Sequence, residues 1–152
     1  MKKDALFPND SIVFLTNRVG RLLANHIRQA AEHESWGLQP QHMGILVDLW
    51  QREGVRQQDL AVSNIKDKGT IARALSSLEE ANYVVRIPDS TDKRNKLIYL
   101  THKGKALQAQ LQPYAQMVME QATAGLNDKD IAICQKVLSH ILKALTTPGQ
   151  EQ

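Results

Sequence analysis

The stretch DKGTIARALSSLEEAN, residues 67–82, and its continuation YVVRIPDSTDKRNKLIYLTHKG, residues 83–104, decide the fold. The first part has apolar residues every three or four positions behind Asp67, a favoured N-cap, and predicts a short amphipathic helix. The second part changes to a two-residue period in β-branched and aromatic runs, which predicts two strands joined by a polar, mostly cationic tip. A helix delivered by a turn and followed by a basic hairpin is a common unit for binding a DNA duplex.

Upstream of this stretch, the sequence predicts three more helices. Apolar residues recur every three to four positions over residues 12–30, which indicates one long amphipathic helix. A second helix starts near Pro40 and ends before Gly54, a residue suited to a left-handed cap. A third, short helix spans about residues 56–63, and residues 64–66 make the turn that leads into the next helix.

Downstream, two further helices complete the chain. Thr101 caps the fifth helix, and Pro113 inside its apolar pattern predicts a kink or a break. Asn127 or Asp128 caps the sixth helix, where Cys134 lies on the apolar stripe and is interpreted as a buried structural thiol. The predicted fold class is therefore mainly α, an α+β winged helix-turn-helix with six helices and a two-stranded β-wing.

Composition narrows the classes of function. The chain has 152 residues, 42% hydrophobic residues and a single Cys, so a disulfide framework and a Cys-based zinc finger are excluded. The N-terminal sequence lacks an apolar core of signal-peptide length, and no run is long enough to span a membrane, so we expect a cytoplasmic protein. Residues 52–105 carry eleven Lys or Arg against seven Asp or Glu, which favours a polyanionic partner.

Neither an enzyme nor a metal protein is indicated. The sequence lacks a GxSxG motif, an HExxH motif and a phosphate-binding glycine loop, so we expect no catalytic residues. The five histidines are scattered and lack nearby Cys or carboxylate ligands, so we expect neither a metal site nor a cofactor.

A winged helix-turn-helix places its second helix in the major groove, where base edges are distinguishable. The residues expected to contact DNA from this recognition helix are Lys66, Lys68, Gly69, Thr70, Arg73 and Ser77. From the hairpin, Arg94 is expected in the adjacent minor groove, with Lys93 and Lys96 on phosphates. The simpler alternative is a solvated helix face, with Arg94 paired to Asp92 in the free protein.

Three motifs carry a family resemblance. Asp67-Lys68-Gly69-Thr70-Ile71, Asp92-Lys93-Arg94 and Leu100-Thr101-His102-Lys103-Gly104 resemble the MarR family of bacterial transcriptional regulators. Three positions depart from the family pattern. Arg56 replaces a small capping residue, whereas Ile65 and Asn82 each replace a glycine.

The resemblance implies a homodimer that binds a pseudo-palindromic operator and represses transcription until a small, often aromatic or phenolic, effector binds or oxidation releases it. It assigns residues 1–35 and 106–147 to a helical dimerisation region, which pairs the N- and C-terminal helices. It implies that residues 36–105 form the DNA-binding domain, and the C-terminal sequence predicts a disordered tail over residues 148–152. The resemblance also implies that Asp92 orients Arg94 or a neighbouring backbone group without touching DNA.

The sequence also suggests an effector pocket and allows two alternative functions. The candidate pocket residues are Trp36, Met43, Trp50 and Tyr114, although apolar residues of this kind more often simply belong to the core. The chain could instead be an architectural DNA binder without sequence preference, or a protein–protein adaptor that uses a winged-helix fold without DNA.

Overall fold

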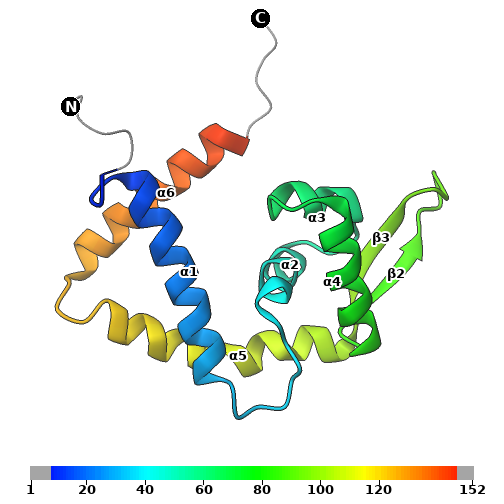
Figure 1. The fold of residues 1–152 in the computed structure, drawn as a ribbon, viewed down its shortest axis with the longest axis horizontal. Helices are drawn as coiled ribbons and strands as arrows, with labels where there is room; N and C mark the ends of the chain where they lie inside the picture. The colour runs from blue at the N-terminus through cyan, green and yellow to red at the C-terminus, as the bar shows by residue number, and fades with distance from the viewer. Residues whose placement is uncertain (1–7, 147–152) are drawn as a thin grey trace, which may run out of the picture. The chain divides into compact units, whose positions relative to one another are not determined.

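The computed structural model describes residues 8–146, which form two compact units, residues 8–118 and residues 119–146. All six predicted helices are present, together with the predicted hairpin (Figure 1). The elements in chain order are α1 (Ile12–Ala30), α2 (Pro40–Gln51), β1 (Val55–Arg56), α3 (Gln57–Ser63), α4 (Lys68–Glu80), β2 (Val84–Pro88), β3 (Lys96–Leu100), α5 (His102–Ala122) and α6 (Asp128–Thr146). The predicted tail, residues 148–152, lies outside the described residues.

Helix α4 forms as its sequence predicts. Its N-cap residue Asp67 accepts a hydrogen bond from the backbone N–H of Thr70 at 2.8 Å. One face is buried and supplies the core of the winged unit with Ile71, Ala74, Leu75 and Leu78. The turn before α4 requires a left-handed residue, and Ile65 fills it with φ +53° while its side chain is 90% exposed.

The hairpin belongs to a three-stranded antiparallel sheet in the order β1-β3-β2. Strands β2 and β3 pair from Val84 opposite Leu100 to Pro88 opposite Lys96, as expected for a wing. The two-residue strand β1 was not predicted, and it places Arg56 opposite Leu97 of β3. This extra strand fixes the start of α3 beside the wing.

The base of the wing explains why the sequence needs glycine at position 104. Asn82 has φ +64°, as its side chain permits, and lets the chain turn from α4 into β2. Thr101 donates its hydroxyl to the Asn82 carbonyl at 2.6 Å and accepts from the Gly104 N–H at 3.0 Å. A Cβ atom on Gly104 would lie 2.2 Å from the carbonyl oxygen of buried Tyr83, so any side chain there would clash with backbone.

Of the predicted kink or break at Pro113, the break is wrong, because helix α5 is continuous through this residue. Proline lacks an N–H, so the helix loses one intrahelical hydrogen bond at that position. The segment within residues 8–118 is held by the burial of Leu107, Leu111 and Val118. Their packing outweighs that local loss.

The second unit contains α6 and the end of α5. The sequence predicted that Cys134 is buried, but its side chain is exposed in the single chain, so that interpretation is wrong. The reason is that the apolar stripe of α6 is itself exposed, including Ile133 at 50% and Leu142 at 64%. Among the helices of residues 8–146, none has the length and apolarity needed to cross a membrane.

Candidate nucleic-acid interface

The front of α4 is a short chain of hydrogen bonds. The hydroxyl of Thr70 donates to Asp67 at 2.8 Å and accepts from Arg73 at 3.2 Å. The two hydrogen bonds from Thr70 lower the pKa of the Asp67 carboxyl, so it stays ionised at neutral pH. Arg73 is thereby held along the exposed face of the helix, where Lys68 and Ser77 are also exposed.

The wing tip has a defined conformation. Asp89 accepts from the backbone N–H and the hydroxyl of Thr91, and the Asp89 N–H donates to the Asn95 carbonyl at 2.9 Å. Asp92 accepts from the Arg94 N–H and Nε, each at 3.1 Å, and from Arg94 Nη2 at 3.3 Å. These bonds lower the pKa of Asp92. Arg94 is nevertheless 91% exposed, so a tethered guanidinium projects into solvent.

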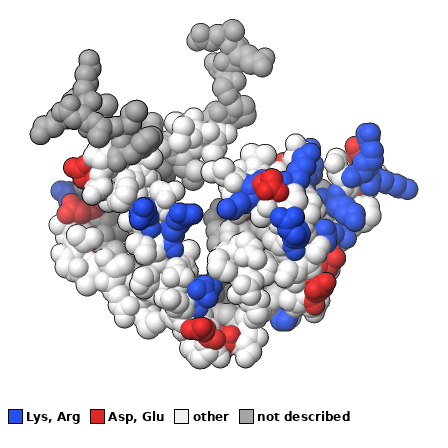
Figure 2. All heavy atoms as spheres, viewed as in Figure 1, with Lys and Arg blue, Asp and Glu red and all other residues white. Residues whose placement is uncertain are grey.

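Between the wing and the two helix starts lies a cleft of about 340 Å³. Its lining residues are Arg56, Gln57, Gln58, Lys68, Arg86, Arg94, Asn95 and Lys96. Figure 2 shows the corresponding surface, with Lys and Arg gathered over the wing and the neighbouring helices. We name this feature the basic cleft, because its lining contains cationic and amide side chains and no carboxylate.

The basic cleft unites only some of the predicted contacts. It brings Lys68 of α4 together with Arg94 and Lys96 of the wing. Six others are not in its lining, although each belongs to the same compact unit: Lys66, Gly69, Thr70, Arg73, Ser77 and Lys93.

Sequence reasoning missed Arg56 and Arg86, which also line the basic cleft. Arg56 was treated as a weak helix cap, yet its N–H, Nε and Nη2 all donate to Asp59, at 3.2, 3.2 and 2.9 Å. Arg86 donates to Ser76 at 2.8 Å and to Glu79 at 3.5 Å. The Arg-x-x-Asp spacing at residues 56–59 was a signal that could have identified the first of these pairs.

Comparison with known proteins identifies this unit. The family model described as "MarR family" matches residues 38–96, from the start of α2 to the beginning of β3. The crystal structure of a MarR transcriptional regulator from Methanosarcina mazei Go1 superimposes with a TM-score of 0.78. That protein is 26% identical, and the match covers 88% of this chain and 94% of the other. Residues 38–96 thus match the MarR family, and the chain is similar to a MarR-type transcriptional regulator over most of its length.

Two further MarR-type relatives are informative. TtmR, an HTH-type transcriptional regulator from Methylorubrum extorquens, is 35% identical over 72 residues, which are 47% of this chain but only 36% of TtmR. CouR from Rhodococcus jostii RHA1, solved bound to p-coumaroyl-CoA, has a TM-score of 0.75 and 26% identity. The match covers 96% of this chain and all of CouR.

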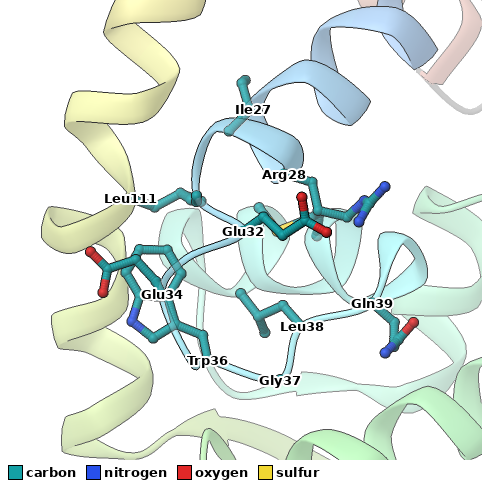
Figure 3. Close-up of a pocket in the computed structure, with 11 residues that line it drawn as sticks. Ile27, Arg28, Glu32, Glu34, Trp36, Gly37, Leu38, Gln39 and Leu111 are labelled. Carbon is teal, nitrogen blue, oxygen red and sulfur yellow. The ribbon is translucent and has the colours of Figure 1, made fainter.

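A second cavity, of about 200 Å³, lies between α1, α2, α5 and the α1–α2 linker, and we name it the linker cavity (Figure 3). It is lined by predicted pocket residues Trp36 and Met43, together with Leu38 and Leu111. Trp50 lies elsewhere, because it lines a different cavity and donates its indole N–H to the Gly104 carbonyl at 2.9 Å.

Tyr114, also a predicted pocket residue, does not line the linker cavity but contacts two residues that do. Its ring packs edge-on against Trp36, with centroids 6.0 Å apart, and its hydroxyl donates to Glu34 at 2.7 Å. This hydrogen bond raises the pKa of the Tyr114 phenol. Trp36 in turn accepts through its carbonyl from the Tyr83 hydroxyl at 2.8 Å, which ties the linker to the base of the wing.

The polar lining of the linker cavity consists of Arg28, Glu32, Glu34 and Gln39. The Nη2 of Arg28 donates to Asn25 at 3.0 Å, whereas its buried Nε has no hydrogen-bond partner among the described residues. Glu32 approaches from the same side in Figure 3. Within residues 8–146, His, Cys, Asp and Glu form no group of three or more that could hold a metal ion.

Proposed function

We propose that this chain is a MarR-family protein that binds double-stranded DNA through the front of α4 and the wing, and thereby controls transcription. The basic cleft carries the proposal, because it joins the two surfaces that would meet a duplex and presents only cationic and amide groups. In this role α4 enters the major groove with Lys68 and Arg73, and Arg94 enters the neighbouring minor groove. Asp92 holds Arg94 in a fixed direction and does not itself touch DNA.

The protein acts as a homodimer in this proposal. Helices α1 and α6 each expose apolar side chains that a monomer would leave in water, including Ile12 at 58%, Leu22 at 55% and Leu142 at 64%. A second copy of the chain covers these faces. Residues 1–35 and 106–147 then form the dimerisation region, and two winged units bind a pseudo-palindromic operator.

The regulator is released by a small aromatic or phenolic effector in the linker cavity. Trp36, Leu38 and Leu111 provide apolar contact for a planar ring, and the unpartnered Nε of Arg28 can donate to an anionic or phenolic oxygen. The structural relative CouR, which is solved with p-coumaroyl-CoA, supports an effector of this class. We propose repression, in which the operator-bound protein blocks transcription until the effector binds, as the family resemblance implies.

Selection of bound duplexes from a random pool tests the whole proposal. We expect enrichment of two inverted half-sites whose centres are about 10 base pairs or a multiple of this apart. Retention of duplexes without an enriched sequence would instead indicate an architectural DNA binder. Absence of duplex binding would favour the protein–protein adaptor.

The effector assignment has its own test. Aromatic carboxylates and phenols are screened by the shift in the midpoint of thermal unfolding, first on the native chain and then on Arg28→Met. A compound that binds in the linker cavity should stabilise the native chain and lose most of this effect in the variant. An equal shift in both proteins would place its site elsewhere.

A further inference from the structure

The basic cleft has a feature that follows from the unpredicted strand β1. Because Arg56 pairs with Leu97 of β3, the first residue before α3 lies next to Lys96, although the two are forty positions apart in sequence. Lys68, the first residue of α4, completes the lining of the cleft. Three separate segments thus surround one basic cavity of about 340 Å³.

The three arginines of the basic cleft share an arrangement. Each guanidinium is bonded to a carboxylate that does not line the cavity: Arg56 to Asp59, Arg86 to Glu79 and Arg94 to Asp92. The two lysines, Lys68 and Lys96, form no ion pair among the described residues. The carboxylates therefore hold the guanidiniums from outside the cavity, and the lining itself contains no negatively charged side chain.

Arg56 retains donors for a further anion. Asp59 occupies its Nε and Nη2, and within residues 8–146 its Nη1 makes no hydrogen bond. The side chain is 49% exposed, so an anion in the cleft can approach it without displacing Asp59. Charge-assisted hydrogen bonds from a planar guanidinium to phosphate are among the stronger polar contacts in proteins.

We infer that the basic cleft seats a backbone phosphate of the bound duplex, with Arg56 and Lys68 as its contacts from the helix side and Lys96 from the wing. This inference rests on the proposed DNA-binding function and adds a role that Arg94 does not fill. Arg94 reads the minor groove beyond the wing tip, whereas the cleft holds the strand that runs between α4 and the wing. Such a contact fixes position on the duplex and contributes little sequence information.

The experiment compares three proteins: the native chain, Arg56→Gln and Arg52→Gln. For each protein, the affinity for the operator and for a random duplex is measured as a function of salt concentration. Arg52 is an exposed arginine four residues earlier that lines a different cavity, so it is a matched control for the loss of one charge. Each lost phosphate contact lowers the slope of log affinity against log salt by about 0.9, hence by about 1.8 for a dimer changed in both winged units. The deficit of Arg56→Gln should therefore shrink roughly tenfold between 50 and 200 mM salt.

Two further variants separate a direct contact from a structural effect. Arg56→Lys keeps the charge and should restore most of the salt slope even though the paired geometry with Asp59 is lost. Asp59→Asn keeps an acceptor for the Arg56 N–H but removes the negative charge behind the guanidinium. It should bind operator and random duplex more tightly than the native chain, and by a similar factor.

The outcomes distinguish this inference from the proposed function. If the native chain binds no duplex, the proposed function fails. If the native chain shows a steep slope of log affinity against log salt, but Arg56→Gln has the same slope as Arg52→Gln, the inferred phosphate contact of Arg56 is overturned. The last measurement is a titration of the native chain and Arg56→Gln with inorganic phosphate. If phosphate binding depends on Arg56 while the slope of log DNA affinity against log salt does not, the cleft binds a free anion and the inference is overturned.

Discussion

The guanidinium of Arg94 shows how one residue combines exposure with a fixed direction. Three hydrogen bonds from its backbone N–H, Nε and Nη2 reach Asp92, yet the side chain is 91% exposed. An exposed ion pair of this kind contributes little to stability. In the proposed function, this pair holds the arginine in one direction before DNA binds.

Replacement of Arg94 by Ala should therefore affect binding and not folding. We expect a loss of about 1–3 kcal/mol in operator affinity, as for other specific contacts, and an almost unchanged midpoint of thermal unfolding. Lys93→Ala is the control at the same tip, and it should weaken operator and random duplex alike. Equal affinity of Arg94→Ala and the native chain for the operator would contradict the role of the wing.

Ile65 is the one residue where backbone conformation conflicts with side-chain type in the turn before α4. A β-branched residue with φ +53° is strained, and its 90% exposed side chain gains little from packing. Ile65→Asn should increase the free energy of unfolding by roughly 1 kcal/mol, because Asn tolerates this conformation. Ile65→Val keeps the branch and should give no increase. The comparison uses chemical denaturation at one protomer concentration, and a destabilised Asn variant would contradict it.

At the scale of elements, the start of α2 depends on a buried histidine. His42 is 2% exposed, and its Nδ1 accepts from the Gln39 N–H at 2.9 Å, so the neutral ring carries its proton on Nε2. That Nε2 has no hydrogen-bond partner among the described residues. Burial lowers the pKa of His42 below its ordinary value of 6.5, so the folded chain resists protonation of this ring.

Burial of His42 at the start of α2 predicts that the free energy of unfolding falls in mild acid. The unfolded chain takes up the His42 proton below about pH 6.5, whereas the folded chain does so only at lower pH. The stabilising contribution is therefore complete above pH 6.5 and declines as the pH falls toward the lowered pKa. His42→Asn retains an acceptor for Gln39 but cannot titrate. Denaturant unfolding at pH 7.5 and 5.5 should show a smaller difference for His42→Asn than for the native chain, and equal differences would contradict the assignment.

The elements also show what a sequence can predict. Helix α4 and the wing carry their own signals, namely the Asp67 cap, the apolar face of the helix and the two-residue period of the strands. Strand β1 carries none, because two residues have no period and Val55–Arg56 becomes a strand only by pairing with residues 97 and 98. The basic cleft was missed for the same reason, since it depends on that pairing.

The two wrong expectations have similar causes. Pro113 predicts a break when local hydrogen bonding alone is considered, but burial of neighbouring turns maintains α5. Cys134 lies on an apolar stripe, and such a stripe was read as buried although the single chain leaves it exposed. Local pattern indicates which side chains are apolar, whereas the surroundings determine which of them are covered.

At the scale of the whole molecule, the exposed apolar faces of α1 and α6 require a partner in the proposed homodimer. Leu142 of α6 is 64% exposed, so its replacement by Glu should cost the isolated chain little. In a dimer interface the same carboxylate would be buried without a partner and should favour monomers. Sedimentation velocity should show this shift. DNA affinity should fall on the order of a hundredfold as the two winged units lose their linkage.

Gln135→Glu provides the control, because it introduces the same charge at another exposed position of α6. It should remain a dimer with nearly unchanged DNA affinity. If Leu142→Glu also remains dimeric, α6 does not contribute to the interface.

The carboxylates behind Arg56, Arg86 and Arg94 also bear on how quickly a binding site is found. A DNA-binding regulator reaches its target by sliding and hopping along unrelated DNA. Each cationic side chain without an ion-pair partner strengthens non-specific binding and so lengthens the residence time at unrelated sites. Asp59, Glu79 and Asp92 reduce that attraction for any passing strand. In the proposed function, the chain thereby keeps a dense set of arginines for its target and shortens its binding to unrelated DNA.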